Sequence, residues 1–549
     1  MRNQRVLGAA IGDCVHVGGV VRFLQLAESM GAEVKSLGPA VAVDQLIAEV
    51  IRFEPDLIAV GYRLTPESGR QVLMHLRDAA DRAGLSRRRW VLGATDPVAD
   101  VARDLNFFEQ VFGSSVDWPA VIAYLRGDAA QAGHELPPQR LVDRIQWRRP
   151  FPLLRHHFGQ PTVAATVAGV RKIAEAGVLD VISLGTDQNA QEHFFRPADM
   201  DPREHGAGGV PVRTPGDLIA LKEASQTGNY PLMRCYAGTR DQLRWAQMLH
   251  ETIENAWCAI PLFWYSKLDG RSQRPLEASI PEVQAVMRWH GERSIPVESN
   301  ESHHWSLRDA PDTVAVAAAY IAAYNARQMG VQDYVQQLMW NNPPLLSPAM
   351  DLAKMLAKLE LVESLAGPTF RVWRECRAGL TSMPAGFDRA KGHLAATTFL
   401  QMAVRPHILH IVGPSEFHHA ATADDVIEGC HVVQGAINLA LQGLPDMAAD
   451  PAVQARKQEL VGEARQLLGA ICELAPQGVA NPLLDAATLA RAVHVGLLDA
   501  PHLLGNGEGL GQVAVRFTDG ACRAYDRATG RTLTETERQA GLRRAGGVA

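Results

Sequence analysis

A histidine in a glycine-containing loop near the amino terminus is the first residue whose type and setting could do chemistry. His16 lies in the stretch 6–19, VLGAAIGDCVHVGG, which is an apolar run followed by a loop and a helix-like segment. This pattern predicts the first strand, loop and helix of a parallel sheet. His16 would then lie at the carboxyl end of a strand, where open α/β sheets bind their ligands. Because Gly12, Gly18 and Gly19 make the loop flexible, the imidazole can project toward a large, flat ligand.

Polar and aromatic residues also gather after strand-like runs in the rest of the chain. They form six clusters, at residues 185–193, 234–241, 264–267, 298–305, 340–342 and 414–419. Arginine in such clusters can bind a carboxylate with two parallel hydrogen bonds, and glutamate and histidine can transfer protons. Each cluster alone is typical of a helix cap or a solvated loop. Six clusters at the same end of successive strands favour an active site there.

Two histidine pairs raise the question of a zinc ion. These are His303-His304 and His418-His419, but the sequence has no H-E-x-x-H motif and no carboxylate at fixed helical spacing. The seven cysteines are scattered without a C-x-x-C pair, as expected of reduced thiols. We therefore expect no protein-bound zinc.

The elements that position His16 follow a βα rhythm. Strands are predicted at residues 32–37, 57–60 and 90–92, helices at 44–53 and 68–83, and a last helix at 116–125. Alternation of this kind predicts a doubly wound, flavodoxin-like α/β domain over residues 1–127.

A polar stretch containing Pro137-Pro138 follows, and residues 128–150 are interpreted as a linker. Beyond it, seven strand-like runs alternate with amphipathic helices. The predicted strands are residues 178–184, 232–236, 258–263, 295–298, 334–339, 370–378 and 408–412. This pattern predicts a (β/α)₈ TIM barrel over residues 151–480, with a small carboxyl-terminal extension over residues 481–549.

Composition sets the class of protein and its partners. The chain of 549 residues is 47% hydrophobic and 21% charged, with a formal net charge of −6. These values give no reason to expect nucleic acid or a membrane surface as a partner. The amino terminus lacks a usable cleavage site, and no apolar stretch approaches the length of a membrane span. We expect a cytoplasmic protein that binds a small acid and forms a homodimer through the barrel.

The first domain resembles the cobalamin-binding domain of B12-dependent mutases and methionine synthase. In that family an Asp-x-His-x-x-Gly loop supplies the lower axial ligand of cobalt, and His16 and Gly19 match it. Cys14 takes the place of the family's Asp, with Asp13 displaced by one position. The family's Ser-x-Leu and Gly-Gly pairs become Tyr62-Arg63-Leu64 and Gly93-Ala94. The resemblance implies that these positions bind cobalamin: His16, Asp13, Cys14, Gly19, Tyr62, Leu64, Gly93 and Ala94.

The second domain resembles, remotely, the large component of glutamate mutase. The similar segments include Ile260-Pro261, residues 276–280 and Gly496-Leu497-Leu498-Asp499-Ala500-Pro501. The whole chain thus looks like the two glutamate mutase components fused in one polypeptide. The family's glutamate-selective Glu and Tyr are not retained in the stretch 255–265, so we expect a different substrate.

The resemblance, for the arginines, and the chemistry of the polar loop residues, for the others, assign roles to residues of the barrel. Arg234, with Arg213 and Tyr265, would bind the substrate. Glu301 or Glu298 would hold the adenosyl ribose, and the catalytic set would be Glu301, His303 and His304. The implied activity is that of an isomerase, an adenosylcobalamin-dependent radical mutase that rearranges the carbon skeleton of a small carboxylic or amino acid. Two alternatives stay open, a corrinoid-dependent methyltransferase and a non-catalytic cobalamin-binding protein.

Overall fold

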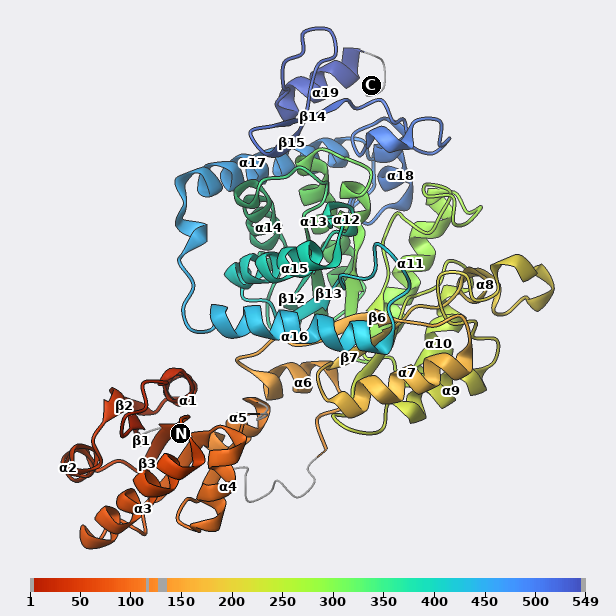
Figure 1. The fold of residues 1–549 in the computed structure, drawn as a ribbon. Coiled ribbons are helices and arrows are strands. Elements are labelled where there is room, and N and C mark those ends of the chain that lie inside the picture. The colour runs from red at the N-terminus through yellow and green to blue at the C-terminus, as the bar shows by residue number, and fades with distance from the viewer. Residues whose placement is uncertain (1–3, 115–117, 127–135, 545–549) are drawn as a thin grey trace. The chain divides into compact units, whose positions relative to one another are not determined.

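The computed structural model describes residues 4–114, 118–126 and 136–544 (Figure 1). The chain divides into two compact units, Met1–Glu135 and Leu136–Ala549. Among the described residues, none of the helices combines the length and the apolar character needed to cross a bilayer.

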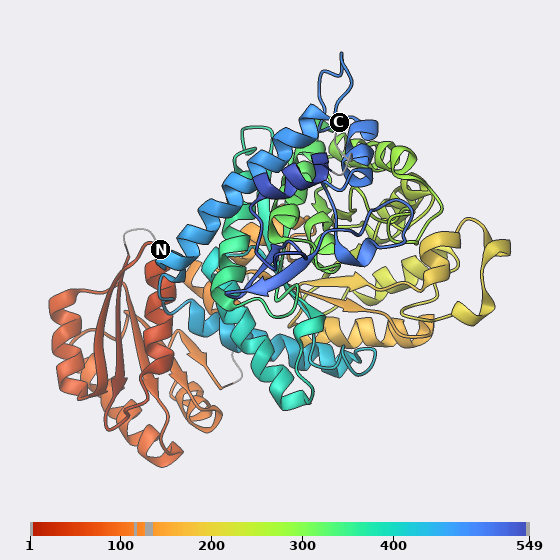
Figure 2. The same ribbon diagram turned by 90° about the horizontal axis from the view of Figure 1, so that it is seen from above.

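The amino-terminal unit is a five-stranded parallel sheet with strand order β2-β1-β3-β4-β5, between two layers of helices (Figure 2). Its strands are β1 (Arg5–Ile11), β2 (Glu33–Val41), β3 (Leu57–Tyr62), β4 (Arg89–Ala94) and β5 (Gln110–Phe112). Its helices are α1 (Gly18–Ser29), α2 (Val43–Phe53), α3 (Pro66–Arg82), α4 (Asp96–Asp104) and α5 (Trp118–Arg126). This order is the flavodoxin-like one, so the doubly wound α/β fold predicted from the sequence is confirmed.

Close packing of α1 on the sheet fixes the loop that carries His16. A Cβ atom at Gly8 or at Gly61 would lie 2.7 Å from the side chain of Val20. Only glycine at these two strand positions lets the first turn of α1 approach so closely. The loop between β1 and α1 is therefore held at the carboxyl ends of the strands.

The second unit contains eight parallel strands that follow one another around a ring. They are β6 (Leu153–Phe158), β7 (Val181–Leu184), β8 (Leu232–Cys235), β9 (Cys258–Ala259), β10 (Val297–Ser299), β11 (Asp333–Trp340), β12 (Arg371–Ala378) and β13 (Ile408–Ile411). Strand β13 pairs with β6, and a parallel bridge from Tyr236 to Ala259 joins β8 to β9. The ring is thus closed, as the prediction of a (β/α)₈ barrel requires.

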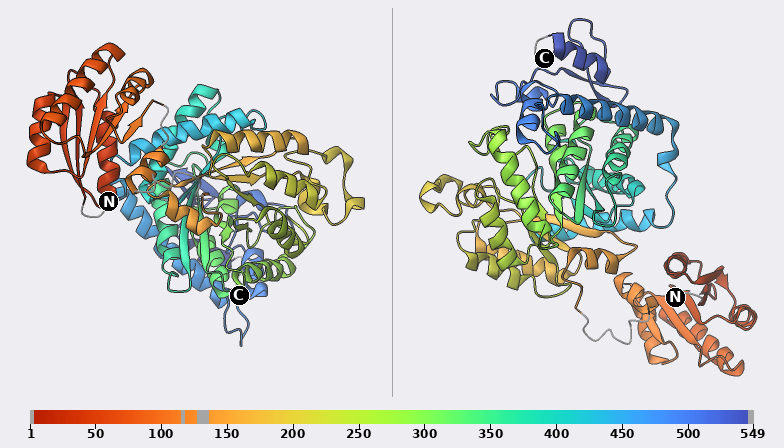
Figure 3. Two further views of the ribbon diagram at one scale, coloured as in Figure 1. Left: turned by 90° about the horizontal axis from the view of Figure 1, so that it is seen from below. Right: turned by 180° about the vertical axis from the view of Figure 1, so that it is seen from behind.

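Helices alternate with these strands and cover the outside of the ring (Figure 3). They are α7 (Val163–Ala176), α9 (Pro215–Ala224), α10 (Gln242–Ile253), α11 (Leu276–Gly291), α13 (Asp312–Gln328), α14 (Pro348–Glu363), α15 (Phe387–Gln401) and α16 (Ala423–Ala440). Two short helices, α8 (Gln188–His193) and α12 (Glu301–Ser306), follow β7 and β10 directly. They lie in two of the six polar clusters noted in the sequence.

Strand β6 was not among the seven predicted strands. Its sequence, LLRHHF, has no uninterrupted apolar run, yet five of its six residues are buried. The strand turns Arg155 into the barrel, where carboxylates pair with it. Paired charges replace the apolar side chains that the sequence pattern requires.

The stretch 128–150 is not simply a linker, which corrects that prediction. Helix α6 (Leu141–Arg148) lies within it, and residues 127–135 are outside the described part of the chain. Leu141 and Ile145 are buried against the amino-terminal ends of the barrel strands. Two apolar residues at i, i+4 spacing suffice to dock one turn of helix, although the surrounding sequence is polar.

Three helices and a small two-stranded sheet follow the barrel helices. These elements are α17 (Pro451–Glu473), α18 (Ala486–His494), β14 (Val515–Thr518), β15 (Ala521–Ala524) and α19 (Glu535–Arg544). Arg456 of α17 pairs with the buried Asp312 of α13 at 3.1 Å. The carboxyl-terminal elements therefore belong to the same compact unit as the barrel.

Candidate functional site

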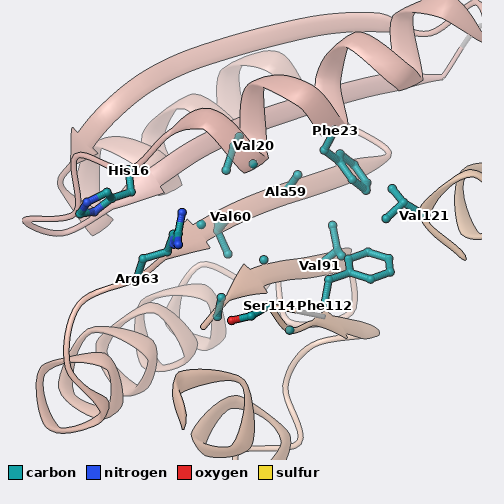
Figure 4. Close-up of a pocket in the computed structure, with 15 residues that line it drawn as sticks. His16, Val20, Phe23, Ala59, Val60, Arg63, Val91, Phe112, Ser114 and Val121 are labelled. Atoms are coloured by element: carbon teal, nitrogen blue, oxygen red, sulfur yellow. The ribbon is translucent and has the colours of Figure 1, made fainter. Parts of the chain in front are cut away.

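A cavity of about 280 Å³ opens at the carboxyl ends of the strands of the amino-terminal sheet. Figure 4 shows His16 and Arg63 toward one end and Phe23, Phe112 and Val121 toward the other. The walls come from α1, β3, β4, β5 and α5. This is the edge at which open α/β sheets bind their ligands.

His16 borders the cavity with an exposed ring, so its imidazole is free to meet a ligand. Its Nδ1 lies 3.9 Å from the buried Sγ of Cys14, and the backbone N–H of Arg63 donates to the same sulfur at 3.3 Å. Cys14 therefore ties the His16 loop to the end of β3. Asp13 is exposed, and within the described structure no hydrogen bond joins it to the ring.

The other residues expected to bind cobalamin divide into two groups. Gly19, Gly93 and Ala94 line the cavity with His16. Tyr62 is buried and donates to Ser68 Oγ at 2.7 Å, on the side of α3, and the exposed Leu64 is not part of the cavity wall. Between them, Arg63 lines the cavity.

The barrel interior is built in layers because alternate residues of each strand point inward. The layer near the amino-terminal ends is apolar: Leu153, Val181, Leu232, Trp257, Val335, Trp373 and Ile408. Two residues further along the strands, the inward positions are charged or polar: Arg155, Ser183, Arg234, Gln337, Glu375 and His410. The next inward positions include His157, Tyr236 and Arg377. A polar centre thus lies above an apolar floor.

Two buried carboxylates of the barrel interior, Glu298 of β10 and Glu375 of β12, have different surroundings. Glu298 accepts hydrogen bonds from four donors: Arg155 at 3.0 Å, Arg234 at 2.7 Å, Trp257 at 2.7 Å and Gln337 at 2.6 Å. Glu375 accepts from Arg155 through Oε1, and its Oε2 has no partner in the described structure. Burial raises the pKa of Glu375. Burial acts on Glu298 in the same direction, but Arg234 and Arg155 outweigh it and hold that pKa low.

Four imidazoles stand near these charges: His157, His303, His304 and His410. Burial, with nearby positive charges, lowers the pKa of each well below its ordinary value. His157 Nε2 lies 2.7 Å from the hydroxyl of Tyr236, and the rings of His303 and His304 stack with centroids 4.4 Å apart. These rings are neutral at pH 7 and can exchange hydrogen bonds without adding charge.

The side chain of Glu301 has a structural role, because three donors of the protein bind its carboxyl group. Its carboxylate accepts from the backbone N–H groups of Leu262 and Phe263 at 2.6 and 3.0 Å, and from Trp305 Nε1 at 2.8 Å. These bonds fix the loop that follows β9. Burial raises the pKa of Glu301 to about 7.

The three residues expected to bind substrate are placed differently. Arg234 is fully buried inside the barrel, with Nη1 and Nε unpartnered in the described structure. The ring of Tyr265 lies 5.8 Å from that of His304. Arg213 is bound through both terminal nitrogens by Asp187, the residue that caps α8.

Five titratable residues of the polar centre were not singled out from the sequence: Arg155, His157, Glu375, Arg377 and His410. Their signal is the period of two within each strand, as in R-x-H at 155–157 and E-x-R at 375–377. Charged residues spaced by two within a buried strand indicate an inward-facing polar row. Finding it requires that the strand itself be recognised first.

Among the described residues, one set of three potential metal ligands comes together outside these sites. Ligand atoms of Glu277, His494 and Glu508 lie within 4.8 Å of one another. His494 Nε2 is hydrogen-bonded to Glu508 at 3.1 Å, and its Nδ1 lies 3.9 Å from a carboxylate oxygen of Glu277. The histidine pairs at 303–304 and 418–419 are not part of it.

The sequence matches no protein-family model and no curated protein. Among solved structures, a cobalamin-binding protein from Desulfitobacterium hafniense DCB-2 is similar at 18% identity over 24% of this chain, with a TM-score of 0.20. The alignment spans 60% of that protein's length. A Rubisco-like protein from Rhodopseudomonas palustris aligns with 58% of this chain and 78% of its own length, at 10% identity and a TM-score of 0.32. The cobalamin-dependent S-adenosylmethionine radical enzyme OxsB aligns over 79% of this chain and 56% of its own, at 12% identity and a TM-score of 0.18.

Proposed function

We propose that this chain is an adenosylcobalamin-dependent radical mutase that rearranges the carbon skeleton of a small carboxylic or amino acid. The observation that carries the proposal is the exposed imidazole of His16 at the cavity of a flavodoxin-like domain. The motif around it resembles the cobalamin-binding loop. The same chain also has a closed barrel with a polar, arginine-containing centre.

The residues around the cavity fit a corrinoid. A Cβ atom at Gly19 or Gly93 would meet nothing within 4 Å, so both glycines border open space. His16 would be the lower ligand of cobalt, and the apolar walls formed by Val91, Phe112 and other residues would surround the displaced nucleotide tail. When bound, adenosylcobalamin would supply the organic radical, which no amino-acid side chain here provides.

The barrel residues favour an acidic substrate. Arg155, Arg234 and Arg377 face inward, and the two carboxylates beside them leave guanidinium nitrogens of all three without partners in the described structure. A buried donor without a partner is costly, and a substrate carboxylate would satisfy several at once. The neutral histidines would orient substrate, and the closed barrel would exclude water from it.

Reconstitution of the full chain tests this function. Under anaerobic conditions we expect adenosylcobalamin to bind with the spectrum of a histidine-ligated corrinoid. His16→Ala should weaken binding at least about tenfold, because a ligand of the metal is lost. His75→Ala, at an exposed position on α3 outside the cavity, is the matched control. Equal affinity in both variants would remove the proposed role of His16.

Electron paramagnetic resonance separates the mutase from the two alternatives. With holoenzyme and a series of small carboxylic and amino acids, a mutase gives a signal of an organic radical coupled to cobalt(II). A methyltransferase would instead turn over methylcobalamin without a radical signal. A non-catalytic binder would do neither.

A further inference from the structure

Of the described residues that line the cavity in the amino-terminal unit, one has a side chain that is always charged, Arg63. Arg63 lines it beside His16, and the other lining side chains are mostly apolar, among them Val20, Phe23 and Val91 (Figure 4). Among the described residues, no aspartate or glutamate is part of the wall. The guanidinium of Arg63 therefore has no counter-charge among the described residues of the wall.

The side chain of Arg63 also has no partner elsewhere in the described structure. Its backbone N–H is held by Cys14 Sγ at 3.3 Å, which fixes where the side chain leaves the β3 loop. The carboxylate of Asp96 accepts a hydrogen bond from the backbone N–H of Ser114, a residue that lines the cavity, at 2.8 Å. Arg63 is thus anchored at its backbone and free at its guanidinium.

A ligand that suits this cavity combines an anion with an apolar ring. The guanidinium binds phosphate through two parallel hydrogen bonds, and the far end of the cavity offers aromatic side chains at Phe23 and Phe112. We propose that Arg63 binds the phosphodiester of the corrinoid's nucleotide tail and so makes this site selective for complete cobalamin over corrinoids without that tail. This inference rests on the proposed function, since it assigns a residue to the same cofactor.

The proposed role of Arg63 can be tested with two corrinoids that differ in the nucleotide tail. Hydroxocobalamin carries the phosphodiester, and diaquacobinamide lacks the nucleotide and its phosphodiester. We would measure both dissociation constants by absorbance titration of the full chain, without turnover, for wild type, Arg63→Gln and Arg63→Lys. Arg70→Gln is the matched control, because Arg70 is exposed on α3 and outside the cavity wall.

We expect Arg63→Gln to weaken hydroxocobalamin binding about tenfold and to leave cobinamide binding unchanged, since one charge-assisted contact is lost. The affinity of Arg63→Lys for hydroxocobalamin should lie between those of wild type and Arg63→Gln, because lysine keeps the charge and loses the planar guanidinium. Added salt should narrow the difference between wild type and Arg63→Gln. Unchanged hydroxocobalamin affinity, or an equal loss for both corrinoids, would overturn the assignment.

A third probe separates this inference from the proposed function. If wild type binds neither corrinoid, the proposed function fails. Titration with the isolated tail nucleotide, α-ribazole 3′-phosphate, then decides whether Arg63 forms an anion site. If wild type binds the nucleotide and Arg63→Gln does not, the assignment of an anion site to Arg63 stands. If wild type does not bind the nucleotide, that assignment fails together with the proposed function.

Discussion

At the scale of single residues, the two buried carboxylates of the barrel show how surroundings set chemistry. Glu298 and Glu375 both contact Arg155 Nη1, yet one is saturated with donors and the other keeps a free oxygen. When the surroundings of two such groups shift their pKa values apart, the groups have different roles. Glu298 holds Arg155 and Arg234 in place. Glu375 has a raised pKa and an oxygen without a partner in the described structure, so it can donate a proton.

Substitution by glutamine should therefore affect the two positions differently. Glu298→Gln leaves Arg155 and Arg234 short of a buried counter-charge, and we expect a loss of about 3–5 kcal/mol in the free energy of unfolding. Glu375→Gln resembles the protonated acid, and we expect a change within about 1 kcal/mol near pH 6. Urea denaturation of both variants measures the contrast. Equal destabilisation would mean that Glu375 is also ionised.

Glu301 should make stability depend on pH. Its pKa is about 7 in the folded chain, against about 4.3 in an unfolded chain. The folded state thus binds the proton more tightly, so the contribution is fully present below about pH 4.3 and is lost as pH rises through 7. Glu301→Gln should flatten the fall between pH 5 and 8 by at most about 1.4 kcal/mol per pH unit. Urea midpoints across that range provide the measurement, and an unchanged slope would contradict the assignment.

The sequence allowed some residues on recognisable loops to be predicted, but not those on strands that it did not reveal. The position of His16 in a loop at a strand's carboxyl end follows from the apolar run and the glycines around it. The loop residue Arg63, by contrast, became a candidate only when the cavity beside it was visible. Arg155 and Glu375 lie far apart in the chain, and only the closed ring brings their charges together.

At the scale of elements, the local pattern predicted several strands whose burial is apolar. Strands β1 and β3 are buried along their length except for one partly buried residue, and their apolar runs predicted them. The sequence pattern did not predict strand β6 or helix α6, for different reasons. Strand β6 buries paired charges in place of an apolar run, whereas α6 docks through only two apolar residues, Leu141 and Ile145. Neither departs from physical rules, but both depend on contacts with residues distant in sequence.

The fit of α1 on the sheet predicts a sharp contrast between two glycines that both line the cavity. Gly61→Ala would place a Cβ 2.7 Å from Val20, whereas a Cβ at Gly93 would meet nothing within 4 Å. We expect Gly61→Ala to reduce the free energy of unfolding by about 1–3 kcal/mol, because α1 must shift or strain. Gly93→Ala should stay within about 0.5 kcal/mol of wild type. Chemical denaturation tests both, and equal effects would show that α1 is not so tightly seated.

At the scale of the whole molecule, the chain combines two units that each have their own hydrophobic core. Among the described residues, one core cluster of the first unit contains residues from Leu7 to Val111, and the clusters of the barrel contain residues from Leu141 onward. A unit with its own core can fold by itself. The doubly wound domain and the barrel could both be predicted, because each follows from a repeated βα pattern over many residues.

When the two units are expressed separately, corrinoid binding should therefore stay with the amino-terminal unit. We expect residues 1–126 to unfold in one cooperative thermal transition and to bind hydroxocobalamin with nearly the affinity of the full chain, since His16 and the cavity lie within this segment. His16→Ala in the same fragment is the control. Residues 136–549 should fold without binding the corrinoid. Calorimetry and absorbance titration measure both properties. A fragment 1–126 that folds cooperatively yet binds no corrinoid would contradict the assignment of the cofactor site to this unit alone.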